Sequence, residues 1–149
     1  MRIKFSFPYD WPILRQTPNY SGLWDKYQFF LEDNGQEYDA WVIFNSLTNV
    51  SETVKCPKDR IILITPEPYS IQYYPSRFVS QFSHVITNQN QIKHKNINIL
   101  HTGTPWFVNR SYDELVVLSE NSVKKTKKIS IITSNKLVTD GHKKRFELQ

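Results

Sequence analysis

Residues 60–65, Arg60-Ile-Ile-Leu-Ile-Thr65, decide the fold. They form a continuous, mostly β-branched apolar run that is bounded by Asp59 and Pro66. Such a run is typical of a central strand in a parallel sheet, because a strand covered on both faces has no polar side with which to alternate. The run therefore predicts a sheet with helices packed on its faces.

The chain on either side of this run alternates between strand-like and helix-like segments. Further strands are expected at residues 1–7, 38–44, 84–87, 97–101 and 129–133. Helices are expected at residues 24–31, 75–82, 111–118 and from 139 onward, and a long loop at residues 8–23. The third of these helices opens with Ser111 and Glu114, which have the spacing of a capping box. The alternation predicts an α/β fold with a Rossmann-like, mostly parallel sheet and flanking helices.

Composition excludes several classes of function. The chain has 149 residues, and its four glycines are widely separated. A dinucleotide-binding fingerprint and a P-loop both need clustered glycines, so both are excluded. Cys56 is the single cysteine, which excludes an internal disulfide and a multi-cysteine zinc site. The histidines lack the spacing of metal ligands, so no metal site is expected.

The net charge of +5 lies mainly in two basic runs, at residues 124–128 and 143–145. A basic chain first suggests nucleic acid, but the aromatic residues are not interleaved with these runs, so no stacking groove is expected. The basic runs are either a solvated face or linker, or they bind an anionic membrane surface or a phosphate-bearing ligand, and these alternatives stay open. No apolar run reaches the roughly 20 residues of a membrane span, and the N-terminus lacks the apolar core of a signal peptide. We therefore expect a cytoplasmic protein, with peripheral contact with a membrane left open.

Glu67 is the first candidate for chemistry, in the stretch Ile64-Thr-Pro-Glu-Pro68. It lies just past the carboxyl end of the predicted central strand, where open parallel sheets bind ligands. Flanking prolines stiffen the backbone, and a carboxylate held there can accept a proton from a substrate hydroxyl. An ordinary solvated loop residue is the alternative. The nearby Tyr69, Tyr73 and Tyr74 either offer a surface for sugar rings or belong to the core.

The second candidate is the stretch Ile132-Thr-Ser-Asn-Lys136, at the end of another predicted strand. The helix that follows would present backbone N–H groups and its dipole to a phosphate. Arg145 lies one to two turns into that helix and could bind a diphosphate through two hydrogen bonds. An ordinary strand-to-helix turn with basic surface residues is the alternative.

Several motifs resemble one known family in the right order. Residues 128–136, Lys-Ile-Ser-Ile-Ile-Thr-Ser-Asn-Lys, followed by residues 139–145, Thr-Asp-Gly-His-Lys-Lys-Arg, look like the donor-site entry segment of the family 10 glycosyltransferases. These are the α-1,3/1,4-fucosyltransferases and their relatives in bacterial surface-polysaccharide clusters. Residues 105–115 look like the segment that precedes this motif in the bacterial branch. Thr65-Pro-Glu-Pro68 resembles the acidic motif that carries the catalytic base. The resemblance covers residues 38–149.

The resemblance implies a GT-B architecture, in which two Rossmann-like domains enclose the active site. It implies metal-independent, inverting transfer of fucose, or a similar sugar, from GDP-fucose to a saccharide hydroxyl. The partners would be a nucleotide sugar and a saccharide acceptor, with no further cofactor. Glu67 would be the general base, Ser134 and Asn135 would contact the donor, and Arg145 would stabilise the leaving diphosphate.

We therefore expect an acceptor-side domain at residues 1–123, a basic linker at 124–128, and the first strand and helix of a donor-binding domain at 129–149. The family continues beyond this point, so a truncated chain that is inactive by itself is expected. Two other classes stay open. One is a stand-alone α/β module that binds a saccharide or a protein, and the other is a basic nucleic-acid-binding domain with steeply salt-dependent affinity.

Overall fold

The structure is a computed structural model that describes residues 1–147 apart from 33, 48, 50, 104–107, 121–123, 125 and 130–134. The chain forms two compact units, Met1–Val117 and Leu118–Gln149. They are called here the first and the second unit. Among the described residues, no helix is both long and apolar enough to cross a membrane.

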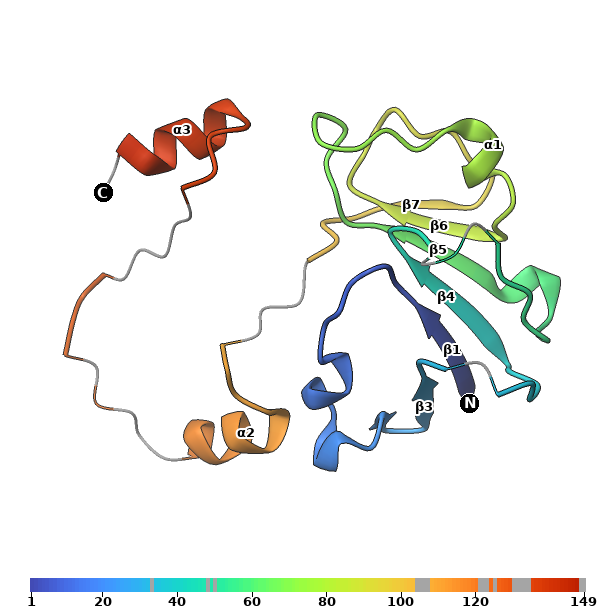
Figure 1. The fold of residues 1–149 in the computed structure, drawn as a ribbon, viewed down its shortest axis with the longest axis horizontal. Helices are drawn as coiled ribbons and strands as arrows, with labels where there is room; N and C mark the ends of the chain where they lie inside the picture. The colour runs from blue at the N-terminus through green and yellow to red at the C-terminus, as the bar shows by residue number, and fades with distance from the viewer. Residues whose placement is uncertain are drawn as a thin grey trace. The chain divides into compact units, whose positions relative to one another are not determined.

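The first unit is built on a seven-stranded sheet (Figure 1). Its strands are β1 (Arg2–Ser6), β2 (Leu23–Trp24), β3 (Tyr27–Phe30), β4 (Ala40–Phe44), β5 (Ile61–Thr65), β6 (His84–Thr87) and β7 (Ile97–Ile99). They lie in the order β2-β3-β1-β4-β5-β6-β7. β2 is antiparallel to β3, and every other neighbouring pair is parallel. The expected α/β fold with a Rossmann-like, mostly parallel sheet is confirmed.

The strand order reverses beside β1. From β1 the chain passes to β3 on one side, and it then crosses to β4 on the other side of β1. β5, β6 and β7 follow in sequence order. In open α/β sheets such a reversal creates a crevice at the carboxyl ends of the two central strands, and ligands bind there. A ligand-binding site is therefore expected at the carboxyl ends of β1 and β4.

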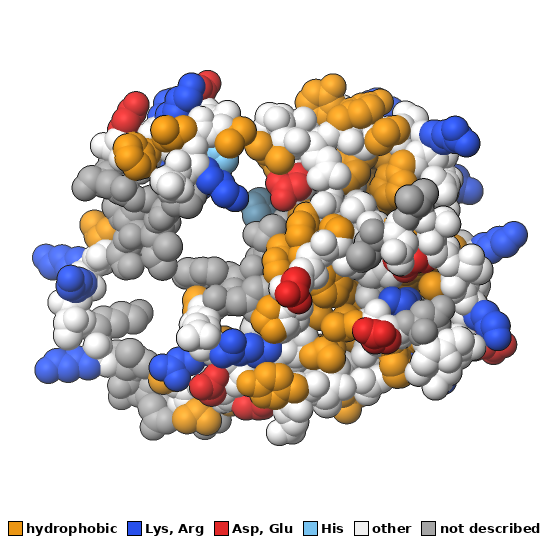
Figure 2. All heavy atoms as spheres, viewed as in Figure 1, with side chains coloured by type: hydrophobic (Ala, Val, Ile, Leu, Met, Phe, Trp, Pro, Cys, Tyr) orange, Lys and Arg blue, Asp and Glu red, His pale blue; other side chains and the backbone are white. Residues whose placement is uncertain are grey.

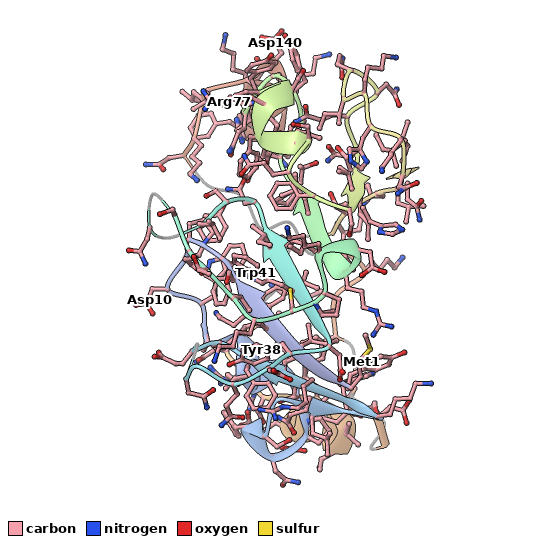
Figure 3. All side chains as sticks on the ribbon, turned by 90° about the vertical axis from the view of Figure 1, so that its right-hand side faces the viewer. Met1, Asp10, Tyr38, Trp41, Arg77 and Asp140 are labelled. Carbon is pink, nitrogen blue, oxygen red and sulfur yellow. The ribbon has the colours of Figure 1, made fainter. Side chains whose placement is uncertain are left out.

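One face of the sheet carries the main apolar core. Ile43, Leu63 and Val85 are neighbours across β4, β5 and β6, and all three are buried. Helix α1 (Ser76–Val79) covers this face together with Phe82. Figure 3 shows Trp41 on β4 near the middle of the sheet and Arg77 on α1. The strand predicted from residues 60–65 therefore lies inside the sheet, between β4 and β6, and contributes to the core.

The helix expected at residues 24–31 is wrong, because this segment contains most of the β2–β3 hairpin. Asp25, in the turn between the two strands, has a φ of 53°, which a right-handed helix does not allow. Tyr27, Phe29 and Phe30 are aromatic residues, which favour strands. β3 completes one side of β1 by parallel pairing. The spacing of the apolar residues fitted a helix, but the open edge of β1 favours a strand.

Fewer helices flank the sheet than the alternation predicted. α1 has four residues and begins directly after Pro75. The described part of the connection from β4 to β5 contains one short 3-10 turn, η3 (Lys58–Arg60). The loop expected at residues 8–23 contains two more, η1 (Ile13–Gln16) and η2 (Pro18–Tyr20).

Helix α2 (Tyr112–Glu120) begins where the capping box predicted. The Ser111 backbone N–H donates to the Glu114 carboxylate at 2.6 Å, and Ser111 Oγ accepts from the Glu114 backbone N–H at 3.2 Å. The bond from the Ser111 backbone is the main cause that holds the pKa of Glu114 below its ordinary value. Asp113 accepts a hydrogen bond from the Asn19 backbone, and the Tyr112 ring packs edge-to-face on Trp24. The start of α2 is thereby fixed to the loop that follows β1.

The second unit contains helix α3 (Asp140–Glu147), which begins near the predicted position. Thr139 Oγ1 accepts a hydrogen bond from the His142 backbone N–H at 3.3 Å. The strand expected at residues 129–133 lies almost wholly outside the described residues. The division between the units falls at residues 117 and 118, ahead of the boundary expected at residue 123.

We expect Leu63→Ala to lower the free energy of unfolding by about 3 kcal/mol, because it leaves a cavity in the core. Ile71→Ala is the control, since the Ile71 side chain is 45% exposed, and it should change stability by about 0.5 kcal/mol at most. Urea unfolding followed by tryptophan fluorescence measures both. A loss for Leu63→Ala no larger than that for Ile71→Ala would contradict the central position of β5.

Candidate functional site

Three loops leave the carboxyl ends of β1, β4 and β5, which are neighbours in the sheet. Tyr9, Asn45 and Glu67 each lie in one of these loops, within three positions of the end of the strand. Parallel strands bring such residues to one edge because their carboxyl ends point the same way. This edge lies at the reversal in strand order, so the fold itself assigns the candidate site.

Asn45 directly follows β4 and is 5% exposed. Its φ of 71° lies in the left-handed region, which asparagine adopts more readily than most residues. Its backbone N–H still donates to the Ile64 carbonyl of β5, at 2.8 Å. The extended conformation of β4 therefore ends at Asn45, while the Asn45 backbone stays paired with β5.

The Asn45 side chain links two tyrosines. Its Nδ2 donates to the Tyr9 hydroxyl at 2.5 Å, and its Oδ1 accepts from the Tyr74 hydroxyl at 2.5 Å. Tyr74 is buried in the core cluster and is also hydrogen-bonded to the backbone of Glu67. A chain of hydrogen bonds thus runs from the loop after β1 to the loop after β5.

The backbone around Glu67 is held from several directions. The Glu67 carbonyl accepts from Gln89 Nε2 at 2.7 Å, and the Pro66 carbonyl accepts from Asn88 Nδ2 at 3.1 Å. Both amides belong to the loop after β6. The Pro68 carbonyl accepts from the Ile71 backbone N–H, which closes a tight turn. Glu67 therefore lies just past the carboxyl end of β5, as predicted. Its loop is held in place by these hydrogen bonds.

The Glu67 side chain is half-buried, and no described lysine, arginine or histidine forms an ion pair with it. Its negative charge acts on the two tyrosines instead. Burial is the largest cause that raises the pKa of Tyr9, and the Glu67 charge adds to it, while the bond from Asn45 opposes it. Burial also raises the pKa of Tyr74, against the hydrogen bond from the Glu67 backbone. Both phenols stay neutral at pH 7.

Aromatic side chains extend the cluster on both sides. The Tyr9 ring stacks on Trp11 with centroids 4.2 Å apart, and Trp11 packs edge-to-face on Phe44. Beyond Glu67, Tyr69 and Tyr73 form an edge-to-face pair and are 51% and 63% exposed. Of the three tyrosines singled out from the sequence, two thus lie at the surface and Tyr74 lies in the core. Figure 2 shows hydrophobic side chains along the middle of the first unit, with Lys and Arg mainly at its margin.

The predicted donor residues belong to the second unit. Ser134 lies outside the described residues, and Asn135 is exposed. Arg145 is exposed in the last turn of α3, whereas the first turn carries Asp140, which forms an ion pair with Lys143. Arg145 is therefore a cation at the surface of α3, and Glu67 belongs to the other unit.

Tyr9 and Asn45 were not among the residues predicted from the sequence to form the site. Two signals could have found them: an asparagine directly after the strand predicted at residues 38–44, and a tyrosine at the start of a long loop. The described residues contain no group of three histidine, cysteine or acidic side chains that could hold a metal ion.

Comparisons with protein-family models, with curated proteins and with solved structures found no match. The fold defines a Rossmann-like α/β domain, and the backbone of Glu67 is held at the carboxyl edge of its sheet.

We expect Tyr74→Phe to lower the free energy of unfolding by about 1–3 kcal/mol, because Asn45 Oδ1 loses its donor in a buried place. Tyr73→Phe removes the same atom from an exposed ring and should cost about 0.5 kcal/mol at most. Urea unfolding of the two variants makes the comparison. Equal losses would mean that the Asn45 link is absent.

We expect a titration of the eight tyrosines to show Tyr9 and Tyr74 ionising later than the rest, above the ordinary pKa of about 10. A tyrosine whose pKa is higher in the folded than in the unfolded chain contributes fully to stability at any pH below the pKa of the unfolded chain. As the pH rises above that pKa, about 10, the contribution is lost, so the free energy of unfolding should fall. Tyrosinate absorbance measures the ionisation. One uniform transition of all eight near pH 10 would contradict the arrangement.

Proposed function

We propose that the chain is the acceptor-side part of an inverting glycosyltransferase of the family 10 type. The whole enzyme would transfer fucose, or a similar sugar, from GDP-fucose to a hydroxyl of a saccharide, and this chain is expected to be inactive by itself. One observation carries the proposal: Glu67 is held by backbone hydrogen bonds at the sheet edge, and no described cation neutralises it. The family resemblance of Thr65-Pro-Glu-Pro68 gives this carboxylate its role.

In the proposed reaction, Glu67 acts as the general base. Its carboxylate accepts the proton of the acceptor hydroxyl while that oxygen attacks the anomeric carbon of the donor. The bond from this carbon to the phosphate oxygen breaks, and the diphosphate leaves with the electron pair. Attack from the opposite side inverts the anomeric centre. A positioned general base typically contributes about 10²–10⁴-fold to the rate.

The donor half of the proposal rests on the second unit. Asn135 and Ser134 would contact the nucleotide sugar, and Arg145 would place two N–H groups on the diphosphate. A positive charge aimed at the leaving group stabilises the charge that develops there, which is the task of a metal ion in other transferases. The exposure of Arg145 is compatible with this role.

A saccharide-binding module without transferase activity is the second candidate. The exposed pair of Tyr69 and Tyr73 favours it, because amphipathic aromatic rings at a surface suit the apolar faces of sugars. The same two rings line a small hollow of about 80 Å³ together with Gln89 and Lys93. The two candidates differ in one result, since only the transferase turns over GDP-fucose.

We expect Glu67→Gln to lower the rate of fucose transfer by about 100-fold or more, because the amide cannot accept the proton. Glu37→Gln is the matched control, since Glu37 is exposed and lies before β4, away from the carboxyl edge. Transfer is measured with radiolabelled GDP-fucose and a panel of oligosaccharides. The 149-residue chain and the longest open reading frame that contains it are both assayed.

Transfer by the longer product that Glu67→Gln abolishes and Glu37→Gln preserves would support the proposal. Unchanged transfer by Glu67→Gln would remove Glu67 as the base. Saccharide binding without turnover of GDP-fucose by either product would favour the binding module.

A further inference from the structure

A hollow of about 590 Å³ opens at the amino ends of β5, β6 and β7, which are neighbours in the sheet (Figure 1). The segments that lead into these three strands line it, at residues 58–59, 80–84 and 93–96. Glu67 follows the carboxyl end of β5, so the hollow lies at the opposite edge of the sheet from the candidate site. Its volume is within the range of pockets that hold small molecules. It is called here the amino-edge hollow.

Positive charge prevails in the lining of the amino-edge hollow. Three lysines line it, Lys58, Lys93 and Lys95, whereas Asp59 is the one acidic residue among its described lining residues. All three lysines are exposed, and within the described part of the chain their ammonium groups form no ion pair or hydrogen bond. A concave surface that is lined mainly by one sign of charge focuses the electric field and attracts ions of the opposite sign. The amino-edge hollow therefore favours an anionic ligand.

Hydrogen bonds fix the backbone on which two of the lysines stand, directly before and after His94. The His94 Nε2 donates to the Phe82 carbonyl at 3.0 Å, and Asn96 Nδ2 donates to the Ser83 carbonyl at 2.9 Å. The Ser83 backbone N–H in turn donates to the Ile61 carbonyl of β5 at 2.8 Å. The backbone of the lining is thus held in place before a ligand arrives, so that little of its conformational freedom is lost on binding.

The side chains of the lining indicate which kind of anion fits. Ammonium groups are common partners of phosphate oxygens, and three of them in one hollow suit an anion with more than one negative charge. The described lining contains no tyrosine or tryptophan, and Phe82 is 9% exposed. A nucleic-acid base therefore finds no such ring on which to stack. The lining favours a small phosphate-bearing group over a single-stranded nucleic acid.

We propose that the amino-edge hollow binds a phosphate-bearing ligand through Lys58, Lys93 and Lys95. The phosphate belongs either to a small soluble compound or to a lipid head group, because both present the same oxygens to the lysines. The proposal does not rest on the transferase activity proposed above, since it concerns the opposite edge of the sheet. It also differs from binding by the basic runs at residues 124–128 and 143–145, which belong to the second unit.

The test is a titration of the isotope-labelled 149-residue chain with inorganic phosphate and with inorganic pyrophosphate at physiological ionic strength, followed by NMR chemical shifts. Flotation with vesicles is the second arm, with phosphatidylcholine alone and with a mixture of phosphatidylcholine and phosphatidylglycerol. The test variant carries Lys93→Gln and Lys95→Gln. The matched control carries Lys127→Gln and Lys128→Gln, which removes the same charge from exposed lysines of the second unit.

We expect pyrophosphate or the mixed vesicles to bind, and the test variant to weaken that binding about tenfold or more, because two charged hydrogen-bond donors are lost. The control should change binding by about twofold at most, since salt screens charges that do not touch the ligand. Binding of pyrophosphate alone would identify a soluble compound, and binding to the mixed vesicles alone would identify a lipid head group.

The test variant should unfold in urea like the original chain, because its lysines have no partners to lose. If it does not fold, Lys58→Gln takes its place. The proposal is overturned if neither the soluble phosphates nor the mixed vesicles bind. It is also overturned if the test variant weakens binding no more than the control does, because binding would then follow the overall charge and not this hollow.

Discussion

The two hydrogen bonds of the Asn45 side chain join the loops that leave the carboxyl edge of the sheet. Through Tyr9 they reach the loop after β1, and through Tyr74 they reach the loop that carries Glu67. Both bonds lie in a largely buried place, where an unpaired amide or phenol would cost free energy. The left-handed backbone of Asn45 is what points its amide at both rings. The geometry of the edge therefore depends on this one residue.

The reversal of strand order beside β1 explains why two hollowed or polar places lie at the same edge. The chain passes from β1 to β3 on one side and then to β4 on the other side of β1. Neither connection therefore covers the carboxyl ends of both β1 and β4. On the β4–β5 side this exposes the Glu67 loop. On the β3–β1 side lies a hollow of about 390 Å³ that is lined by Lys4 and Ser6.

The sequence was sufficient wherever local pattern and tertiary context agree. The buried run at residues 61–65, the capping box at Ser111 and the position of Glu67 after β5 follow from patterns that span a few residues. The helix predicted at residues 24–31 was wrong because the apolar spacing there fits a helix, whereas the free edge of β1 favours a strand. Asn45 and Tyr9 were missed because their contact depends on which strands are neighbours in the sheet. Local sequence patterns do not determine the order of the strands. The same holds for Lys4, which an alternating strand would place on a solvated face.

The most direct test of this account is the nuclear Overhauser spectrum of the isotope-labelled chain. The hydrogen bond from Asn45 Nδ2 to the Tyr9 hydroxyl predicts cross-peaks between the Asn45 side-chain amide protons and the Tyr9 ring protons. These residues are 36 positions apart in the sequence, so only the folded edge can bring them together. Assigned resonances of both residues without such a cross-peak would contradict the arrangement of β1, β4 and β5 on which the candidate site rests.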